Sequence, residues 1–340
     1  GLEYGVESVL VTSGSRPGLY ATYMTLVDPG DTVVYPVPSW NNNHYVHLSG
    51  ARGVPVFCHV DAAFLPTRTM LEDAVRGARL LVLNSPLNPS GTAFTAQQLG
   101  EICDLVLEEN ARRGPGERPL YLLYDQVYWM LTFGQTTHVD PVSLRPEMKQ
   151  YTVFVDGISK SFASTGVRVG WIVGPPDLMG RMGSLVGHVG AWAPRAEQLA
   201  VAALLGDRPA IEAYHRTMKA GVFDRLEAIY EGLLALGGRG FPVQAVMPMG
   251  AIYLSARFEL HGGVTPQGKT LATNDDIRHY LLEAAGMAVV PFQAFGLPDE
   301  TGWFRLSVGA VSRAEIAPVL RRLEEALAAL SFERTEAAAA

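Results

Sequence analysis

The sequence of 340 residues is short of cysteine and of long apolar segments, and each shortage excludes a class of protein. Its two cysteines, Cys58 and Cys103, lack the spacing of a metal site or a disulfide framework, so we expect reduced thiols, no metal and a cytoplasmic protein. No segment approaches the roughly 20 consecutive apolar residues that cross a bilayer. No signal peptide is visible either, although residues ahead of the printed start would hide one. We therefore expect no membrane partner.

Charge is also scarce, since only 18% of the residues are charged. The formal net charge is −7, and no basic stripe is present, which argues against a nucleic-acid partner. The length suits one large α/β domain and one small domain, each with its own core.

Apolar runs that indicate buried strands alternate with helical stretches through the first two thirds of the chain. This alternation predicts a mostly parallel sheet with helices on both faces. After Leu205 the pattern changes to that of a smaller C-terminal α+β domain. We expect a large domain over residues 1–222, a small domain over 223–335, and a frayed tail at 337–340. The expected elements include helices over 95–112, 209–236, 274–285 and 312–330, a loop over 113–117 and a strand over 251–256.

The most informative stretch joins a buried strand to a lysine. The strand Tyr151 to Val155 breaks at Gly157, and Lys160 and Arg168 follow. A lysine that forms a Schiff base needs a partly dry pocket, which lowers its pKa. The planar fork of arginine matches phosphate oxygens. A solvated surface lysine is the alternative that these residues alone leave open.

Two further apolar runs end in polar residues. Leu80 to Leu83 precedes a loop with Asn88, and Leu120 to Tyr124 precedes Asp125 and Tyr128. The C-terminal ends of strands are where open α/β sheets bind ligands. A turn without a ligand and an aspartate that caps a helix remain the alternatives.

Three more segments carry candidate residues. Gly14 and Pro17 suit a tight turn into a helix, whose N-terminus favours phosphate. Trp40 follows another strand, although a lone tryptophan is usually a core residue. Arg305 has apolar neighbours on both sides, which favours a buried functional side chain over a surface charge.

In this order, the motifs resemble those of the class I/II aminotransferases, fold type I enzymes that use pyridoxal 5'-phosphate (PLP). The resemblance covers nearly the whole chain. It rests on Ser-Lys-Ser-Phe-Ala-x-Thr-Gly-x-Arg-x-Gly-Trp at 159–171, Asn-x-Pro-x-Asn-Pro-Ser-Gly at 84–91, Asp-x-x-Tyr at 125–128, Asp-Pro-Gly-Asp at 28–31 and Phe-Arg-Leu-Ser at 304–307.

The resemblance implies a role for each residue. Lys160, Asp125 and Tyr128 would be catalytic. Lys160 would form the Schiff base, and Asp125 would face the pyridine nitrogen. The cofactor-binding residues would be Gly14, Ser15, Arg16, Trp40, Asn88, Asp125, Tyr128, Lys160 and Arg168. The substrate-binding residues would be Arg305, Asn88 and Trp40, with Arg305 on the α-carboxylate.

The function implied is transfer of an amino group from an α-amino acid to a 2-oxo acid. The alternatives are a PLP-dependent C–S lyase or decarboxylase on the same fold, and a non-catalytic sensor domain of a regulator. Relatives complete each site across a dimer, so we expect a homodimer, with Leu185 to Ala193 in its interface.

The sequence departs from the family pattern in three places. Gly157 stands where many relatives have a phosphate-binding serine. No counterpart of the family's N-terminal arm precedes the first strand, so either the printed chain is part of a longer one or the protein does without the arm. Residues 186–198, with His188 and Arg195 as candidates for an acidic side chain of the substrate, do not align residue by residue.

Overall fold

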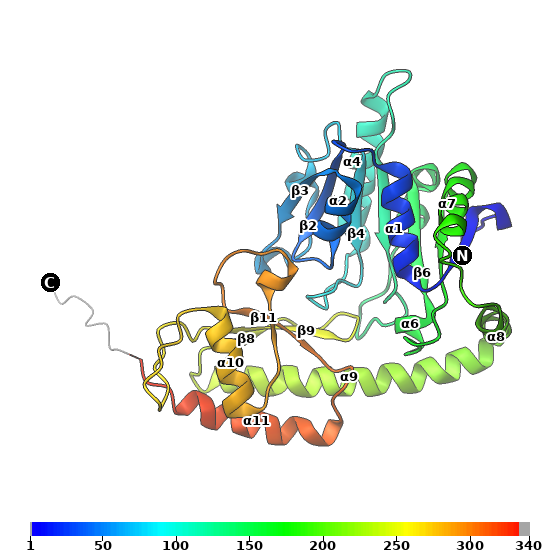
Figure 1. Cartoon of the computed structure of the whole chain (residues 1–340). Coiled ribbons are helices and arrows are strands. Elements are labelled where there is room, and N and C mark those ends of the chain that lie inside the picture. Colours follow the sequence, from blue (N-terminus) through cyan, green and yellow to red (C-terminus); the bar gives the residue numbers. More distant parts are fainter. Residues whose placement is uncertain (1, 333–340) are drawn as a thin grey trace. The chain divides into compact units, whose positions relative to one another are not determined.

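The structure of the protein, a computed structural model, describes residues 2–332 (Figure 1). The chain divides into two units, which we describe separately. The first comprises the chain up to Asn88, Thr92–Lys219 and Met249–Ala251. The second comprises Pro89–Gly91, Ala220–Pro248 and the chain from Ile252 onward. The division falls inside one long helix, and the predicted domain boundary after residue 222 stays a proposal.

Seven strands form the sheet of the first unit, in the order β1-β7-β6-β5-β4-β2-β3. They are β1 (Val9–Thr12), β2 (Thr32–Val37), β3 (Arg52–Phe57), β4 (Leu80–Asn84), β5 (Tyr121–Asp125), β6 (Thr152–Gly157) and β7 (Gly170–Val173). Only β7 is antiparallel to its neighbours, β1 and β6. The C-terminal ends of β1, β2, β4, β5 and β6 therefore lie at one edge. The predicted mostly parallel sheet is confirmed.

Helices cover both faces of this sheet (Figure 1). On β7, Ile172 faces α1 (Ser15–Leu26), where a Cβ added to Gly18 would lie 2.6 Å from the Ile172 side chain. The next residue, Val173, packs on the opposite face against the core cluster that holds Leu99 of α4 (Ala96–Arg112). The other helices of the unit are α2 (Asn42–Ser49), α3 (Arg68–Leu71), α5 (Pro141–Leu144), α6 (Ile158–Ser161), α7 (Pro176–His188) and α8 (Arg195–Gly206).

Helix α4 begins where the sequence predicts, because its capping signals are local. The Thr95 hydroxyl accepts a hydrogen bond from the Gln98 N–H at 3.2 Å, and the Gln98 side chain accepts one from the Thr95 N–H at 3.1 Å. This capping box satisfies N–H groups that would otherwise lack a partner. The helix then buries Leu99, Ile102 and Val106, and the predicted loop follows at residues 113–117.

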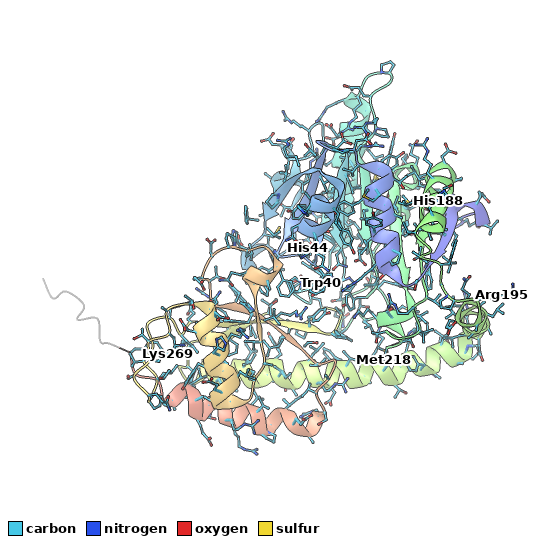
Figure 2. All side chains as sticks on the ribbon, in the orientation of Figure 1. Trp40, His44, His188, Arg195, Met218 and Lys269 are labelled. Carbon is cyan, nitrogen blue, oxygen red and sulfur yellow. The ribbon has the colours of Figure 1, made fainter. Side chains whose placement is uncertain are left out.

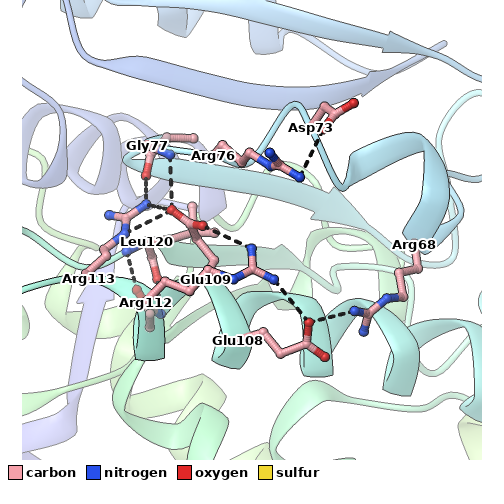
Figure 3. Close-up of polar contacts among 11 residues, drawn as sticks. Arg68, Asp73, Arg76, Gly77, Glu108, Glu109, Arg112, Arg113 and Leu120 are labelled. Carbon is pink, nitrogen blue, oxygen red and sulfur yellow. Dashed lines mark hydrogen bonds and ion pairs between the residues drawn. The ribbon is translucent and has the colours of Figure 1, made fainter.

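The last turn of α4 carries two glutamates in different environments (Figure 3). The buried Glu109 carboxylate accepts hydrogen bonds from the Gly77 N–H at 3.0 Å and from the Arg113 guanidinium at 2.9 Å. Glu108 is more exposed and pairs with Arg68 at 2.6 Å and with Arg112 at 3.5 Å. Arg113 is almost buried, so its charge depends on Glu109 for compensation.

Glu109→Ala is expected to lower the free energy of unfolding by about 3 kcal/mol, because it leaves the Arg113 charge buried without its carboxylate. Glu108→Ala is the matched control on the same turn and should cost less than about 1 kcal/mol. Urea unfolding of both variants measures the difference. Equal losses would show that burial does not distinguish the two pairs.

The second unit has a four-stranded antiparallel sheet in the order β10-β11-β9-β8. The strands are β8 (Val243–Ala245), β9 (Tyr253–Phe258), β10 (Val290–Pro291) and β11 (Trp303–Ser307). The helices are α9 (Arg208–Gly238), which starts in the first unit, α10 (Asn274–Ala285) and α11 (Arg313–Ala328). The predicted smaller α+β architecture is confirmed.

One predicted strand is displaced. The strand expected from residue 251 begins at Tyr253, because Ala251 has a left-handed φ of 61° and donates its N–H to the Leu131 carbonyl at 2.8 Å. The expected tail at 337–340 lies outside the described residues. Across residues 2–332, no helix combines the length and apolar character that a membrane crossing requires.

Candidate active site

The segments that carry the candidate residues of the first unit meet at one edge of its sheet. Lys160 follows β6, Asp125 ends β5, and Asn88 follows β4. Trp40 follows β2, and Ser15 begins α1 directly after β1. Because the C-terminal ends of these strands lie together, the topology brings together residues that are far apart in sequence.

The β4–β5 pair fixes the Asn88 loop relative to Asp125. Asn84 and Asp125 are register partners, and the Asn84 side-chain amide donates to the Asp125 carbonyl at 2.8 Å. The Asn84 side-chain oxygen accepts from the Asn88 N–H at 2.9 Å. Asn84 therefore holds the predicted cofactor loop on the strand that ends in the predicted acid. The sequence motif contains Asn84, but its positioning role was not predicted.

Asp125 and Lys160 interact electrostatically. Burial raises the pKa of Asp125 to about 6, while a hydrogen bond from the Val127 N–H and the charge of Lys160 lower it. That hydrogen bond, at 3.2 Å, gives Asp125 part of the geometry of a capping residue. A capping role alone does not explain a carboxyl group at this desolvated edge beside a lysine.

Glycines allow the backbone to approach closely beside Arg168. A Cβ on Gly14, whose φ is 79°, would lie 2.0 Å from an Arg168 guanidinium nitrogen. A Cβ on Gly170 would lie 2.6 Å from the Ser15 nitrogen. A Cβ on Gly157 would lie 2.9 Å from the Gly170 Cα, so a larger residue at position 157 would require the backbone to shift. The Arg168 guanidinium donates to the Ser13 carbonyl at 3.1 Å.

This geometry suits a phosphate group. Helix α1 has no side-chain cap at Gly14 and no acidic residue in its first turn. The helix itself therefore supplies no anion for its first N–H groups and its positive dipole end. Arg168 adds a cation next to Gly14. The donors are those that a phosphate-bearing cofactor requires, with Ser15 and Arg16 in the first turn. The residues of this edge therefore fit PLP.

A second carboxylate, Asp156, connects the two halves of the site. Its side chain is buried, and it accepts hydrogen bonds from the Trp129 indole N–H at 2.8 Å and from the Gly157 N–H at 2.7 Å. Trp129 follows the Asp125–Tyr128 turn, whereas Gly157 precedes Lys160. A third bond, from the Ser161 hydroxyl to the Val127 carbonyl at 3.2 Å, joins the same two segments. These hydrogen bonds were not predicted from the sequence.

Burial raises the pKa of Asp156 from its ordinary value of 3.8 to about 8, against the two hydrogen bonds that lower it. The unfolded chain therefore releases this proton between about pH 4 and pH 8 while the folded protein keeps it, so the wild type loses stability as the pH rises through this window. Asp156→Asn does not titrate. Its unfolding free energy relative to wild type should therefore rise across the window by more than about 1.4 kcal/mol, the value of one pKa unit.

Urea unfolding at pH 4, 6 and 8 measures this slope. The exposed Asp73→Asn is the control and should show no such trend. The asparagine amide also faces an N–H group, which adds a constant cost, so only the slope is diagnostic. A difference that is constant across the three pH values would contradict a neutral Asp156.

The remaining predicted residues of this unit have different exposures. Tyr128 is buried, whereas Trp40 is 41% exposed, which excludes the alternative that Trp40 is a core residue (Figure 2). Tyr45 was not predicted. It stacks on Tyr23 at 5.3 Å, and its pKa, which burial raises, is lowered by the charge of Arg16 and raised by that of Asp125. His188 ends α7 and Arg195 begins α8, and both are exposed.

Arg305 lies in the second unit, on β11. Its guanidinium is 4.7 Å from the centre of the Tyr253 ring and 4.9 Å from that of Phe295. These two rings hold the planar group by cation–π contacts, so Arg305 is not a solvated surface charge. Neither ring was predicted, because their proximity to Arg305 depends on the β9–β11 pairing and on the 3-10 helix Phe292–Phe295 that follows β10.

Comparisons with known proteins agree with the motifs and the fold. The model of the family Aminotransferase class I and II matches residues 1–323. The aspartate aminotransferase of Rhizobium meliloti (strain 1021) is 33% identical over 335 residues, which cover 97% of this chain and 77% of that protein. The aspartate aminotransferase of Geobacillus stearothermophilus is 32% identical over 304 residues, which cover 88% of this chain and 72% of that protein.

Solved structures extend the agreement. The crystal structure of the aspartate aminotransferase from Rhizobium meliloti has a TM-score of 0.86 and 31% identity, covering 97% of this chain and 79% of that one. The aromatic aminotransferase from Pyrococcus horikoshii has a TM-score of 0.81 and 27% identity, covering 94% and 79% of the two chains. The chain therefore belongs to the aminotransferase class I and II family, and it is a transaminase.

Proposed function

We propose that the protein binds PLP through Lys160 and transfers the amino group of an α-amino acid to a 2-oxo acid. The family implies the cofactor and the two substrate classes. The observation that carries the proposal is the interaction of Lys160 with the desolvated Asp125, at the edge where α1 begins without a cap. We propose an acidic amino donor first, because the relatives in Rhizobium and Geobacillus are named for aspartate.

The side chains divide the chemistry between them. Bound PLP supplies a ring that withdraws electrons from the substrate Cα. Asp125 provides the anion for the ring nitrogen, and Asn88 and Tyr128 bind the phenolic oxygen. Ser15, Arg16, Arg168 and the N–H groups beside Gly14 hold the phosphate, and Trp40 packs on the ring. Lys160 Nζ removes the proton at Cα and returns it as general base and acid, while Arg305 orients the substrate carboxylate.

An exchange assay tests this function. Purified protein with PLP and L-aspartate should convert 2-oxoglutarate to glutamate, and a screen of other amino donors ranks the specificity. Parallel measurements of thiol release and carbon dioxide separate transamination from elimination and decarboxylation. Thiol or carbon dioxide release without glutamate formation would contradict the proposal.

We also propose a homodimer whose interface includes Leu185 to Ala193. In and beside this stretch, Val189 and Trp192 are exposed, and a cavity of about 310 Å³ lies between α1 and the end of α7. Apolar side chains exposed together suggest a surface that another protein copy covers.

Trp192→Glu is expected to weaken the dimer at least about tenfold, because interfacial tryptophans are frequent hot spots. Light scattering across a dilution series measures the effect. Leu282→Glu, at an exposed leucine of α10, is the control and should leave the dimer unchanged. A monomeric wild type with full activity at working concentration would refute the proposal.

A further inference from the structure

Two side chains of α9 bind the end of the turn that carries Lys160. The Tyr214 hydroxyl donates to the Phe162 carbonyl at 3.0 Å. The His215 Nε2 lies 2.8 Å from the Ser161 carbonyl, and since a carbonyl only accepts, Nε2 carries the proton. The two carbonyls are consecutive and directly follow Lys160, within the first unit. We call Tyr214 and His215 the lysine clamp.

Phe162 shields the His215 half of the clamp from water, whereas the Tyr214 side chain is 41% exposed. The Phe162 ring stacks on Tyr214, with ring centres 6.2 Å apart and planes at 11°, and its centre lies 4.8 Å from that of His215. Phe162 and His215 are both buried. Hydrogen bonds away from water are stronger and more costly to leave unmade.

Backbone strain next to the clamp shows why such contacts are needed. Ala163, directly after Phe162, has a left-handed φ of 50°. Its N–H donates to the Lys160 carbonyl at 3.1 Å, and the Phe162 N–H donates to the Ile158 carbonyl at 3.1 Å. A non-glycine residue in this conformation is disfavoured and persists only where its surroundings hold it. The lysine clamp binds the two carbonyls that precede Ala163.

We propose that Tyr214 and His215 are positioning residues that fix the direction in which Lys160 leaves the backbone. The proposal rests on the proposed function in assigning the cofactor to Lys160, but the clamp itself belongs to the protein without cofactor. Helix α9 runs unbroken from the clamp past Lys219 into the second unit. The clamp therefore ties the Lys160 turn to the helix that joins the two units.

Hydrogen exchange in the cofactor-free protein tests the clamp directly. In Tyr214→Phe/His215→Phe, which keeps an aromatic ring at both positions but removes both donors, the Phe162 and Ala163 amides should exchange about tenfold faster or more. His215→Gln, which retains an amide N–H donor, should stay near wild type. Arg216→Gln, at an exposed neighbour on the same helix, should not change exchange. If the double variant does not fold, Tyr214→Phe alone should show about a threefold increase.

A second readout separates positioning from simple stabilisation. In PLP-loaded protein, the visible absorbance of the cofactor is measured as the pH is varied. The midpoint of its change should shift by about half a pH unit or more in the double variant and not in Arg216→Gln. Unchanged exchange would overturn the proposal, and so would faster exchange with an unshifted midpoint, because the bonds would then be merely structural. If wild-type Lys160 takes up no PLP, the proposed function fails, while exchange alone still decides whether the clamp holds the turn.

Discussion

Asp125→Asn is expected to lower kcat by at least about a hundredfold to a thousandfold while the protein still binds PLP. The substitution nearly preserves size but removes the anion that we propose for the ring nitrogen, and loss of one preorganised electrostatic group has an effect of this order. Burial has already raised the pKa of this carboxyl to about 6, so the fold holds a costly charge at neutral pH. If turnover falls as expected, a group that is costly to the fold would be shown to have a chemical role.

Stability measurements separate the chemical role of Asp125 from a capping role. Its raised pKa makes the wild type less stable as the pH rises from about 4 to about 6, so Asp125→Asn should be no less stable than wild type at pH 8. Asp140→Ala is the control for loss of a cap, because Asp140 caps α5 by accepting hydrogen bonds from the Val142 and Ser143 N–H groups. It should lose about 1 kcal/mol of stability and keep its turnover. Near-normal turnover of Asp125→Asn would reduce Asp125 to a structural residue.

Arg305→Lys is expected to raise KM strongly for α-amino acids. The factor by which kcat/KM falls should correspond to a loss of about 2–5 kcal/mol of binding free energy. Lysine keeps the charge but loses the fork that binds a carboxylate with two parallel hydrogen bonds. It also loses the planar surface that Tyr253 and Phe295 hold in wild type. The rate loss should therefore depend on whether the amino donor has a carboxylate.

The decisive comparison uses two donors, an α-amino acid and a simple amine without a carboxylate. Arg305→Lys should impair the first far more than the second. Arg257→Lys is the control from the neighbouring strand, since Arg257 pairs with Glu259 at 2.5 Å and donates to the Thr301 carbonyl. It should leave the ratio of the two donors unchanged. Equal losses for both donors in Arg305→Lys would exclude Arg305 as the carboxylate anchor.

Local signals allowed several elements to be predicted accurately. Helix α10 has the predicted bounds, residues 274–285, because Thr273 caps its start and Gly286 adopts the left-handed conformation at its end. Strand β9 was misplaced by two residues, because nothing local reveals that Ala251 bonds to Leu131. Several predicted strands end in polar residues. The alternation of strands and helices predicts a parallel sheet, in which these ends lie at one edge, so the position of the candidate site could be predicted.

Contacts between distant segments could not be predicted in this way. Asp156 binds Trp129 across 27 positions of sequence, and His215 binds Ser161 across 54. An aspartate before a glycine and a histidine in a long helix have no pattern that marks a partner. Their roles follow from the packing of β6 beside β5 and of α9 beside the Lys160 turn.

Borohydride reduction of the PLP-loaded protein, followed by peptide mass spectrometry, tests the assignment of Lys160 most directly. The yellow protein should lose its visible band, and the pyridoxyl group should lie on Lys160. Lys269 is the natural comparison, because it pairs with Asp276 at 2.7 Å on the second unit (Figure 2). A pyridoxyl group on Lys269 or Lys219, or no label after reconstitution with PLP, would contradict the assignment on which the proposed chemistry depends.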